Sequence, residues 1–306
     1  MKYIYGPIIS RRLGRSLGIS PIPEKTCNYS CIYCQLGITD TFTNERTLFY
    51  PVESIMDEFD RFVKSDISFD VVTIVGEGEP TLYLGLGDLV RGLHERTDKP
   101  VAIITNGALL YKEDVASDCM EADIVLPTLD GYDEASFSRI NHHHKTIRFT
   151  DMYDGIKRFS HQYKGELWLE IMLMKGINDD DETLEKYRKL LKPIQYDRLY
   201  LNTPIRPPAV KGVEMSDTET MKRAENILHG TSINTIGHET FASAEENDLD
   251  ALLDIFKRHP MNEYEIKAFL KARHHNGDEI FRELKKHPLI TVSTYKGMDV
   301  FSHKRK

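Results

Sequence analysis

Short apolar runs rich in β-branched residues alternate with amphipathic segments from about residue 15 to residue 235. Continuous apolar runs of this length are typical of strands that are covered on both faces. The apolar runs are 15–22, 70–76, 100–105, 122–127, 167–174, 198–203 and 232–237. The helical patterns between them include 52–65, 86–97, 151–163 and 180–191. This alternation predicts parallel strands joined by crossover helices, and about six such units predict an α/β fold of the partial (β/α)6 barrel type.

The pattern changes after residue 245. Three short amphipathic segments follow, and then two alternating runs flank the dipeptide Lys296-Gly297, which is typical of a hairpin turn. The three segments are 248–260, 262–275 and 277–288, and the hairpin covers 289–303. Three helices followed by a hairpin is the element order of a winged helix-turn-helix. We therefore predict two domains, a barrel over 1–245 and a winged-helix-like domain over 246–306.

The charge is distributed unevenly between these two parts. The net charge is −8, yet residues 256–306 carry 12 Lys and Arg against 6 Asp and Glu. A basic module on an acidic body indicates an anionic partner such as a nucleic acid, although a solvated charged helix face has the same composition. The basic side chains available for phosphates would be Lys267, Lys271, Arg273, Arg282, Lys285 and Lys286, with Lys296 in the wing.

Composition also bears on where the protein works. The N-terminal residues lack a long apolar run behind a basic start, and the whole chain lacks a stretch that approaches the roughly 18 to 20 apolar residues of a membrane span. We therefore expect a cytoplasmic protein without a membrane partner.

Four cysteines in 306 residues do not form a disulfide framework, and close-set cysteines in a reducing compartment more often bind metal or do redox chemistry.

Three of the four cysteines, Cys27, Cys31 and Cys34, fall within eight residues. A structural zinc site needs a fourth ligand, and the nearest histidine cluster, 142–144, lies more than a hundred residues away. A thioredoxin-like C-x-x-C pair would leave Cys27 unexplained. Three thiolates can instead hold three irons of a [4Fe–4S] cluster and leave the fourth iron open to a substrate or cofactor. The remaining Cys119 is interpreted as a buried apolar thiol.

Polar residues follow the predicted strands at the edge where a barrel places its active site. The loop "GEGEP", residues 76–80, follows the second strand, and its glycines allow the backbone to approach a ligand closely. Taken alone, each of these polar residues is more often a turn residue or a helix cap. The side chains in this set are Thr105, Asn106, Thr128, Asp130, Asn202, Thr203 and Arg206. Glu170 lies inside the fifth strand, where a functional role and a structural salt bridge are equally compatible with its apolar neighbours.

The C-x3-C-x2-C spacing, directly after a first strand and ahead of a (β/α) barrel, resembles the radical S-adenosylmethionine (SAM) superfamily. The resemblance implies that Cys27, Cys31 and Cys34 bind a [4Fe–4S] cluster and that Tyr33 is the aromatic residue usual before the third cysteine. The loop Gly76, Glu77, Gly78, Glu79 and Pro80 is similar to the family's Gly-Gly-Glu segment, which holds the amino group of SAM, but Glu77 interrupts the glycine pair. It further implies that the following residues contact SAM or substrate: Thr105, Asn106, Thr128 and Asp130.

A closer resemblance covers roughly residues 3–240. The opening "YGPIISRRLGRSLGISPIPEKTCNYSCIYCQLG", with "GEGEPTL" and "NTPIRPP", is similar to the uncharacterised radical SAM proteins grouped with the wyosine-synthesising tRNA enzymes. Those enzymes carry a second cluster on cysteines ahead of the SAM motif, and this chain has no cysteine before Cys27. Cluster binding and SAM cleavage are therefore implied, whereas synthesis of the tricyclic base is not.

The implied chemistry starts with an external one-electron reductant of the ferredoxin or flavodoxin type. Reduction of the cluster cleaves SAM to methionine and a 5′-deoxyadenosyl radical, which takes a hydrogen atom from a macromolecular substrate. RNA, most simply tRNA, is the favoured substrate, with Glu170, Asn202 and Arg206 as candidate catalytic residues. A peptide or protein substrate is the alternative within this chemistry, and an iron–sulfur regulator that binds DNA is the alternative outside it.

Overall fold

The computed structural model describes residues 1–65, 67–233, 240–241, 243, 245, 247–273 and 277–304. Its largest element is a nine-stranded sheet with the order β10-β9-β8-β7-β6-β5-β2-β1-β11. The strands are β1 (Ile4–Ser10), β2 (Gly14–Ile19), β5 (Val71–Ile74), β6 (Val101–Thr105), β7 (Ile124–Pro127), β8 (Glu166–Met172), β9 (Arg198–Asn202), β10 (Thr231–Ser232) and β11 (Thr240–Phe241).

The strands from β2 to β10 run parallel, as the sequence predicts. Each pairs in parallel with its neighbour in the sheet, from β2 with β5 to β9 with β10. Their carboxyl ends therefore meet at one edge, where loops from successive strands can share a site. At the other margin β1 pairs antiparallel with β2 and with β11.

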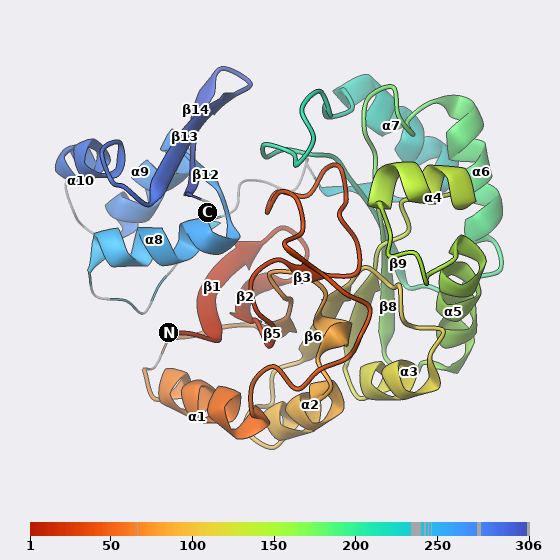
Figure 1. Cartoon of the computed structure of the whole chain (residues 1–306), viewed down its shortest axis with the longest axis horizontal. Helices are drawn as coiled ribbons and strands as arrows, with labels where there is room; N and C mark the ends of the chain where they lie inside the picture. Colours follow the sequence, from red (N-terminus) through yellow and green to blue (C-terminus); the bar gives the residue numbers. More distant parts are fainter. Residues whose placement is uncertain are drawn as a thin grey trace.

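Seven helices connect the described strands of this sheet. They are α1 (Val52–Val63), α2 (Leu86–His94), α3 (Glu113–Met120), α4 (Glu134–Asn141), α5 (Phe149–Gln162), α6 (Asp181–Leu191) and α7 (Thr218–Leu228), with a 3-10 turn at Pro80–Leu82. Helix α4 ends against the cysteine loop, and the others lie around the outer side of the sheet (Figure 1). The main core lies between these helices and the sheet, and it contains fully buried Phe59, Phe62 and Phe159. None of the helices described here is long and apolar enough to cross a membrane.

The predicted elements agree with the structure where the periodicity is long. The predicted helices 52–65, 86–97, 151–163 and 180–191 correspond to α1, α2, α5 and α6. Helices α3 and α4 are not predicted, because eight residues give too few turns for a clear apolar stripe, and α7 is not among the predicted helical patterns either. The last predicted strand begins as β10, and residues 234–237 of it lie outside the described residues.

The C-terminal segment, residues 247–304, contains α8 (Asp248–Arg258), β12 (Met261–Asn262), α9 (Glu263–Ala272), α10 (Gly277–Leu284), β13 (Ile290–Tyr295) and β14 (Met298–His303). Its three strands form a small sheet in the order β12-β14-β13. Lys296 and Gly297 both have positive φ, 52° and 76°, as the predicted hairpin turn requires.

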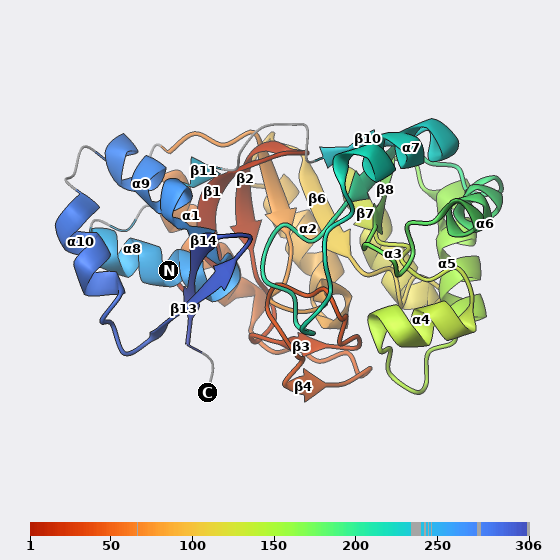
Figure 2. The same cartoon turned by 90° about the horizontal axis from the view of Figure 1, so that it is seen from above.

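The C-terminal segment packs against the antiparallel margin of the large sheet (Figure 2). Ile8 of β1 and Phe241 of β11 share one apolar cluster with Phe256, Phe269 and Phe301 of the segment. The core of the segment is therefore continuous with the edge of the large sheet. This contact brings the end of α8 to the loops that follow the parallel strands.

Candidate active site

The three clustered cysteines line one cavity of about 190 Å³ at the carboxyl ends of the strands. Cys27 ends the short strand β3 (Thr26–Cys27), which pairs with β4 (Thr41–Phe42), and Cys31 and Cys34 follow in an irregular loop. The three cysteines form no disulfide within the described part of the chain, and as whole residues they are partly exposed. We call this space the cluster cavity.

The surroundings of the thiols fit an iron–sulfur cluster. Burial raises the pKa of the Cys27 and Cys31 thiols, so thiolates at these positions need a compensating positive charge, which iron ions supply. Hydrogen-bond donors already point at the sulfur atoms: the Tyr29 amide lies 3.4 Å from Cys27 Sγ, and Asn141 Nδ2 lies 3.4 Å from Cys31 Sγ. Such donors stabilise cluster sulfurs and tune the reduction potential.

The loop Gly76–Pro80 lies directly against the strand that leads into Cys27. A Cβ atom on Gly78 would lie 1.8 Å from the carbonyl oxygen of Thr26, so only glycine fits there. The Glu79 amide donates to that same oxygen at 3.0 Å, and the Lys25 amide donates to the Glu77 carbonyl at 2.5 Å. We call residues 27–34, which carry the three cysteines, the cluster loop. The backbone hydrogen bonds therefore join the predicted SAM loop to the start of the cluster loop.

Glu79 is fully buried and accepts four hydrogen bonds. The donors are the Thr81 amide (3.0 Å) and hydroxyl (2.6 Å), the Thr105 hydroxyl (2.6 Å) and the Asn106 amide (2.7 Å). Burial raises the pKa of this carboxyl, while the hydrogen bonds act in the opposite direction. In the structure Glu79 thus joins the ends of β5 and β6, and Thr105 and Asn106 also line the cluster cavity.

Asp130 lies behind the cluster cavity. It accepts hydrogen bonds from the Tyr33 hydroxyl, from Asn141 Nδ2 at 3.0 Å and from the Met172 amide at 2.9 Å. Burial raises the pKa of Asp130 to about 6. Tyr33 and Thr128 line the cavity, whereas Asp130 is not among its described lining residues. Asp130 therefore acts on the cavity indirectly, by holding the Tyr33 hydroxyl.

A second cavity of about 320 Å³, the outer pocket, adjoins the cluster cavity. Both are lined by Tyr33, Cys34, Leu36 and Gly78. Further side chains of the outer pocket come from distant segments: Arg11 and Arg12 from the turn between β1 and β2, Asn202 at the end of β9 with Thr203 and Arg206 after it, and His259 after α8. The candidate residues Asn202 and Arg206 thus meet beside the cluster loop.

Glu170 forms a salt bridge, which is one of the two roles that the sequence left open for it. Its carboxylate pairs with Arg12 and accepts a hydrogen bond from Asn202 Nδ2 at 3.2 Å. Arg206 is also paired: its guanidinium contacts the Pro260 carbonyl and lies 3.3 Å from Glu265 in α9. Both arginines line the outer pocket, whereas Glu170 and Glu265 are not among its described lining residues.

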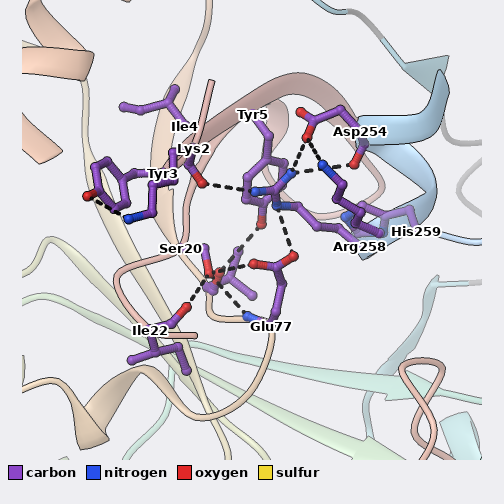
Figure 3. A network of polar contacts seen from close by, with 12 residues as sticks. Lys2, Tyr3, Ile4, Tyr5, Ser20, Ile22, Glu77, Asp254, Arg258 and His259 are labelled. Carbon is purple, nitrogen blue, oxygen red and sulfur yellow. Dashed lines mark hydrogen bonds and ion pairs between the residues drawn. The ribbon is translucent and has the colours of Figure 1, made fainter. Parts of the chain in front are cut away.

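Several residues of the site were missed by sequence reasoning. Arg12 and Gln35 lie within the quoted opening stretch but were given no role there, and Asn141, which belongs to no motif, reaches the site because α4 ends there. Glu77, which interrupts the expected glycine pair, is paired with Arg258 at the end of α8 (Figure 3). The doublet Arg11-Arg12, at the turn before the first parallel strand, was the one available signal for the outer pocket.

Other predicted residues have less distinctive surroundings. Cys119 is fully buried in the main core, as an apolar thiol would be. Several basic residues of the C-terminal segment face acids of the same part of the chain: Lys267 lies 3.9 Å from Glu263, Lys285 lies 3.4 Å from Asp299, and Arg273 pairs with Asp248.

Comparison with known families gives a match that covers more than half of the chain. The family model described as the radical SAM superfamily matches residues 22–187. A UPF0026 protein of Methanocaldococcus jannaschii is 36% identical over 302 residues, which cover 95% of this chain and 93% of that protein. A protein named GTPase Obg, from Brachyspira hyodysenteriae, is 41% identical over 224 residues; the match covers 73% of this chain and 33% of that protein, so the chain spans about a third of that relative.

Two solved structures share the fold at low sequence identity. A radical SAM methyltransferase from Sphaerobacter thermophilus has a TM-score of 0.56 at 17% identity, over 71% of this chain and 66% of its own. A structure of TYW1 with a lysine-pyruvate adduct bound has a TM-score of 0.54 at 20% identity, over 71% of this chain and 74% of its own. With three thiols converging at the mouth of a parallel sheet, these matches identify the chain as a member of the radical SAM superfamily, whose members are enzymes that use SAM and an iron–sulfur cluster.

Proposed function

We propose that this protein reductively cleaves SAM at a [4Fe–4S] cluster and removes a hydrogen atom from a macromolecular substrate, with RNA as the favoured substrate. The observation that carries the proposal is the single cavity lined by Cys27, Cys31 and Cys34 together with the Gly76–Pro80 loop. When bound, cluster and SAM supply a 5′-deoxyadenosyl radical to the substrate. The cysteines would hold three irons, and the fourth iron would bind SAM.

The residues of the chain would hold and shield the bound SAM. Thr105, Asn106 and Thr128 line the cluster cavity with polar groups suited to the amino acid part or the ribose of SAM. Apolar Val75, Leu36 and Ile104 line it as well and would exclude water from the reacting atoms. An external one-electron reductant is required, and a cytoplasmic location, which keeps such thiols reduced, is part of the proposal.

RNA is favoured because three arginines line the outer pocket beside the cluster cavity. Guanidinium groups match phosphate oxygens in shape and charge, and an outer pocket that adjoins the cluster cavity suits the substrate. We assign Asn202 and Arg206 to substrate contacts there and Glu170 to holding Arg12.

We also propose two domains, 1–245 and 246–306, the second of the winged-helix type, since its helix and strand order and its β13–β14 hairpin support that assignment.

A peptide or protein substrate is the second candidate. The exposed face of α10 mixes Glu279 and Glu283 with Arg282, and such mixed charge suits a peptide better than a nucleic-acid groove. An iron–sulfur regulator that binds DNA would need no SAM cleavage, so formation of 5′-deoxyadenosine separates it from both enzyme proposals.

The test is anaerobic reconstitution followed by reaction with SAM and dithionite. The protein should hold about four irons and four sulfides, form 5′-deoxyadenosine, and change the mass of a component in cellular RNA. The triple variant with Cys27, Cys31 and Cys34 replaced by Ala should lose the cluster and SAM cleavage, and Cys119→Ala serves as the matched control. A triple variant with a full cluster would contradict the assignment, and a changed peptide with unchanged RNA would favour the second candidate.

A further inference from the structure

The end of helix α8 is the place where the C-terminal segment contacts the predicted SAM loop. Arg258, the last residue of α8, is 6% exposed although it carries a charge. A buried guanidinium is stable only when its donors are paired, because the loss of hydration is costly. Its partners therefore show what this residue is built to hold.

The Arg258 side chain contacts four residues, which lie in three parts of the chain (Figure 3). Its Nη1 lies 3.1 Å from Asp254 Oδ1, its Nη2 donates to the Lys2 carbonyl at 3.2 Å, and its Nε lies 3.4 Å from Glu77 Oε1. The guanidinium carbon lies 4.6 Å from the centre of the Tyr5 ring. The first contact is local to α8, and the other three join α8 to the barrel.

Glu77 is the residue through which this contact reaches the loop. Its carboxylate accepts a hydrogen bond from the Ser20 hydroxyl at 3.1 Å, and its carbonyl accepts one from the Lys25 amide at 2.5 Å. Lys25 lies two residues before Cys27, and Glu77 lies between the two glycines of the SAM loop. The pair Glu77–Arg258 thus holds the residue that lies between Gly76 and Gly78.

The same end of α8 also contacts the cluster loop. Gln35, the residue after Cys34, donates from Nε2 to the Arg258 carbonyl at 3.3 Å. A separate link lies on the far side of the outer pocket, where the Tyr295 hydroxyl donates to the Pro204 carbonyl at 2.9 Å. The C-terminal segment thus touches the loops of the cluster, of SAM and of β9.

From these contacts we infer that Arg258 is a positioning residue for SAM, which holds the Gly76–Glu79 backbone in its binding shape through Glu77, and that the C-terminal segment is part of the SAM site. The inference rests on the proposed function, because it assigns SAM to this loop. It explains why a carboxylate stands where the family has glycine: the loop is tied to a helix that lies outside the barrel.

The test compares Arg258→Gln with Arg273→Gln in the reconstituted full chain. Arg273 follows α9, pairs with Asp248 and donates to the Ser243 and Glu245 carbonyls, so it also stabilises the C-terminal segment, but none of its described contacts is in the SAM loop. We expect Arg258→Gln to weaken SAM binding, measured by equilibrium dialysis, by about tenfold or more, since it removes a partly buried charge pair. Arg273→Gln should bind SAM as the parent does, and iron content should stay unchanged in both.

Three further measurements exclude a purely structural role. Arg258→Lys keeps the charge and should recover part of the affinity, Glu77→Gln should weaken SAM binding without Arg258 being changed, and the double variant should lose less than the product of the two single losses. The KM for SAM in uncoupled 5′-deoxyadenosine formation should rise more than kcat falls. If Arg258→Gln does not fold, Glu77→Gln carries the test, because the amide keeps the shape and the Ser20 contact.

Unchanged SAM affinity in both Arg258→Gln and Glu77→Gln would overturn the inference, as would an equal loss in Arg273→Gln. Failure of this inference can be told apart from failure of the proposed function. A parent protein that assembles a cluster yet neither binds nor cleaves SAM would contradict the proposed function itself, whereas a parent that cleaves SAM beside variants of parental affinity would contradict the role of Arg258 alone.

Discussion

The cluster cavity and the outer pocket are neighbours, but they are built in different ways. The cluster cavity is lined by loops that follow successive strands, β5, β6 and β7, and by the short cysteine loop. The outer pocket takes its arginines from the β1–β2 turn and from the loop after β9, and His259 from the C-terminal segment. The first depends on local backbone geometry, and the second depends on the packing of distant segments.

This difference determines what substitutions do in each cavity. In the cluster cavity the two loops meet through backbone atoms at Gly78 and Thr26, so a single added methyl group is disruptive there. In the outer pocket the critical contacts are ion pairs between side chains, Arg12–Glu170 and Arg206–Glu265, which can be removed in matched pairs. The following predictions test this comparison.

The largest effect is expected from Gly78→Ala. Its Cβ atom would overlap the Thr26 carbonyl, and because that atom is backbone, the whole cluster loop has to move. We expect loss of SAM binding together with a lower iron content after reconstitution. Gly92→Ala in α2 is the control, since its Cβ would meet only the flexible Met56 side chain at 3.3 Å, and iron content and SAM affinity should remain parental. Full iron content in Gly78→Ala would show that the two loops are independent.

The next effect is expected from Arg12→Gln, which leaves the Glu170 carboxylate buried without its cation. Removing one partner of a buried pair costs about 3 to 5 kcal/mol, and urea unfolding of the metal-free protein measures it. The double variant Arg12→Gln with Glu170→Gln should recover most of the loss, because neither amide is charged. Arg15→Gln is the control: its pair with Asp70 is exposed, so it should cost less than about 1 kcal/mol. Equal losses in the single and double variants would rule out the pair as the cause.

A third prediction concerns pH and the carboxylate behind Tyr33. The pKa of Asp130 is about 6 in the folded protein and about 3.9 in an unfolded chain. Between these values the folded state holds more protons, so the contribution of Asp130 to the free energy of unfolding falls as the pH rises from about 4 to about 6. The total fall is ~3 kcal/mol, because one pKa unit corresponds to about 1.4 kcal/mol.

Asp130→Asn should remove this pH dependence. Urea unfolding of parent and variant between pH 4 and pH 7 measures the difference between the two curves. Asp70→Asn is the control, since Arg15 lowers the pKa of Asp70 to about 2, and its titration lies below this range. Parallel curves for the parent and Asp130→Asn would show that Asp130 titrates normally in the folded protein.

The two cavities also differ in how far the sequence predicts them. The spacing of Cys27, Cys31 and Cys34 and the GEGEP loop are local signals, and the parallel order of the strands places both at one edge. No local signal connects Arg12 to Glu170 or Arg258 to Glu77, because each pair joins residues more than 150 positions apart. The sequence also does not show side-chain direction: Glu79 accepts hydrogen bonds from Thr105, and Asp130 accepts one from the Met172 amide. Contact of either carboxylate with a ligand stays a prediction.

The smallest effect is expected from the basic side chains of the C-terminal segment. Lys267 and Lys285 face Glu263 and Asp299 across exposed pairs, so Lys267→Gln and Lys285→Gln should each change the free energy of unfolding by less than about 1 kcal/mol. If RNA enters through the outer pocket, these variants should also keep the salt dependence of binding to an RNA stem-loop. Each lysine that does contact a phosphate would reduce the slope of log affinity against log salt by about 0.9. A reduced slope in the lysine variants would therefore assign RNA recognition to the C-terminal segment, as the charge distribution along the chain predicts. An unchanged slope would assign RNA recognition to the arginines of the outer pocket.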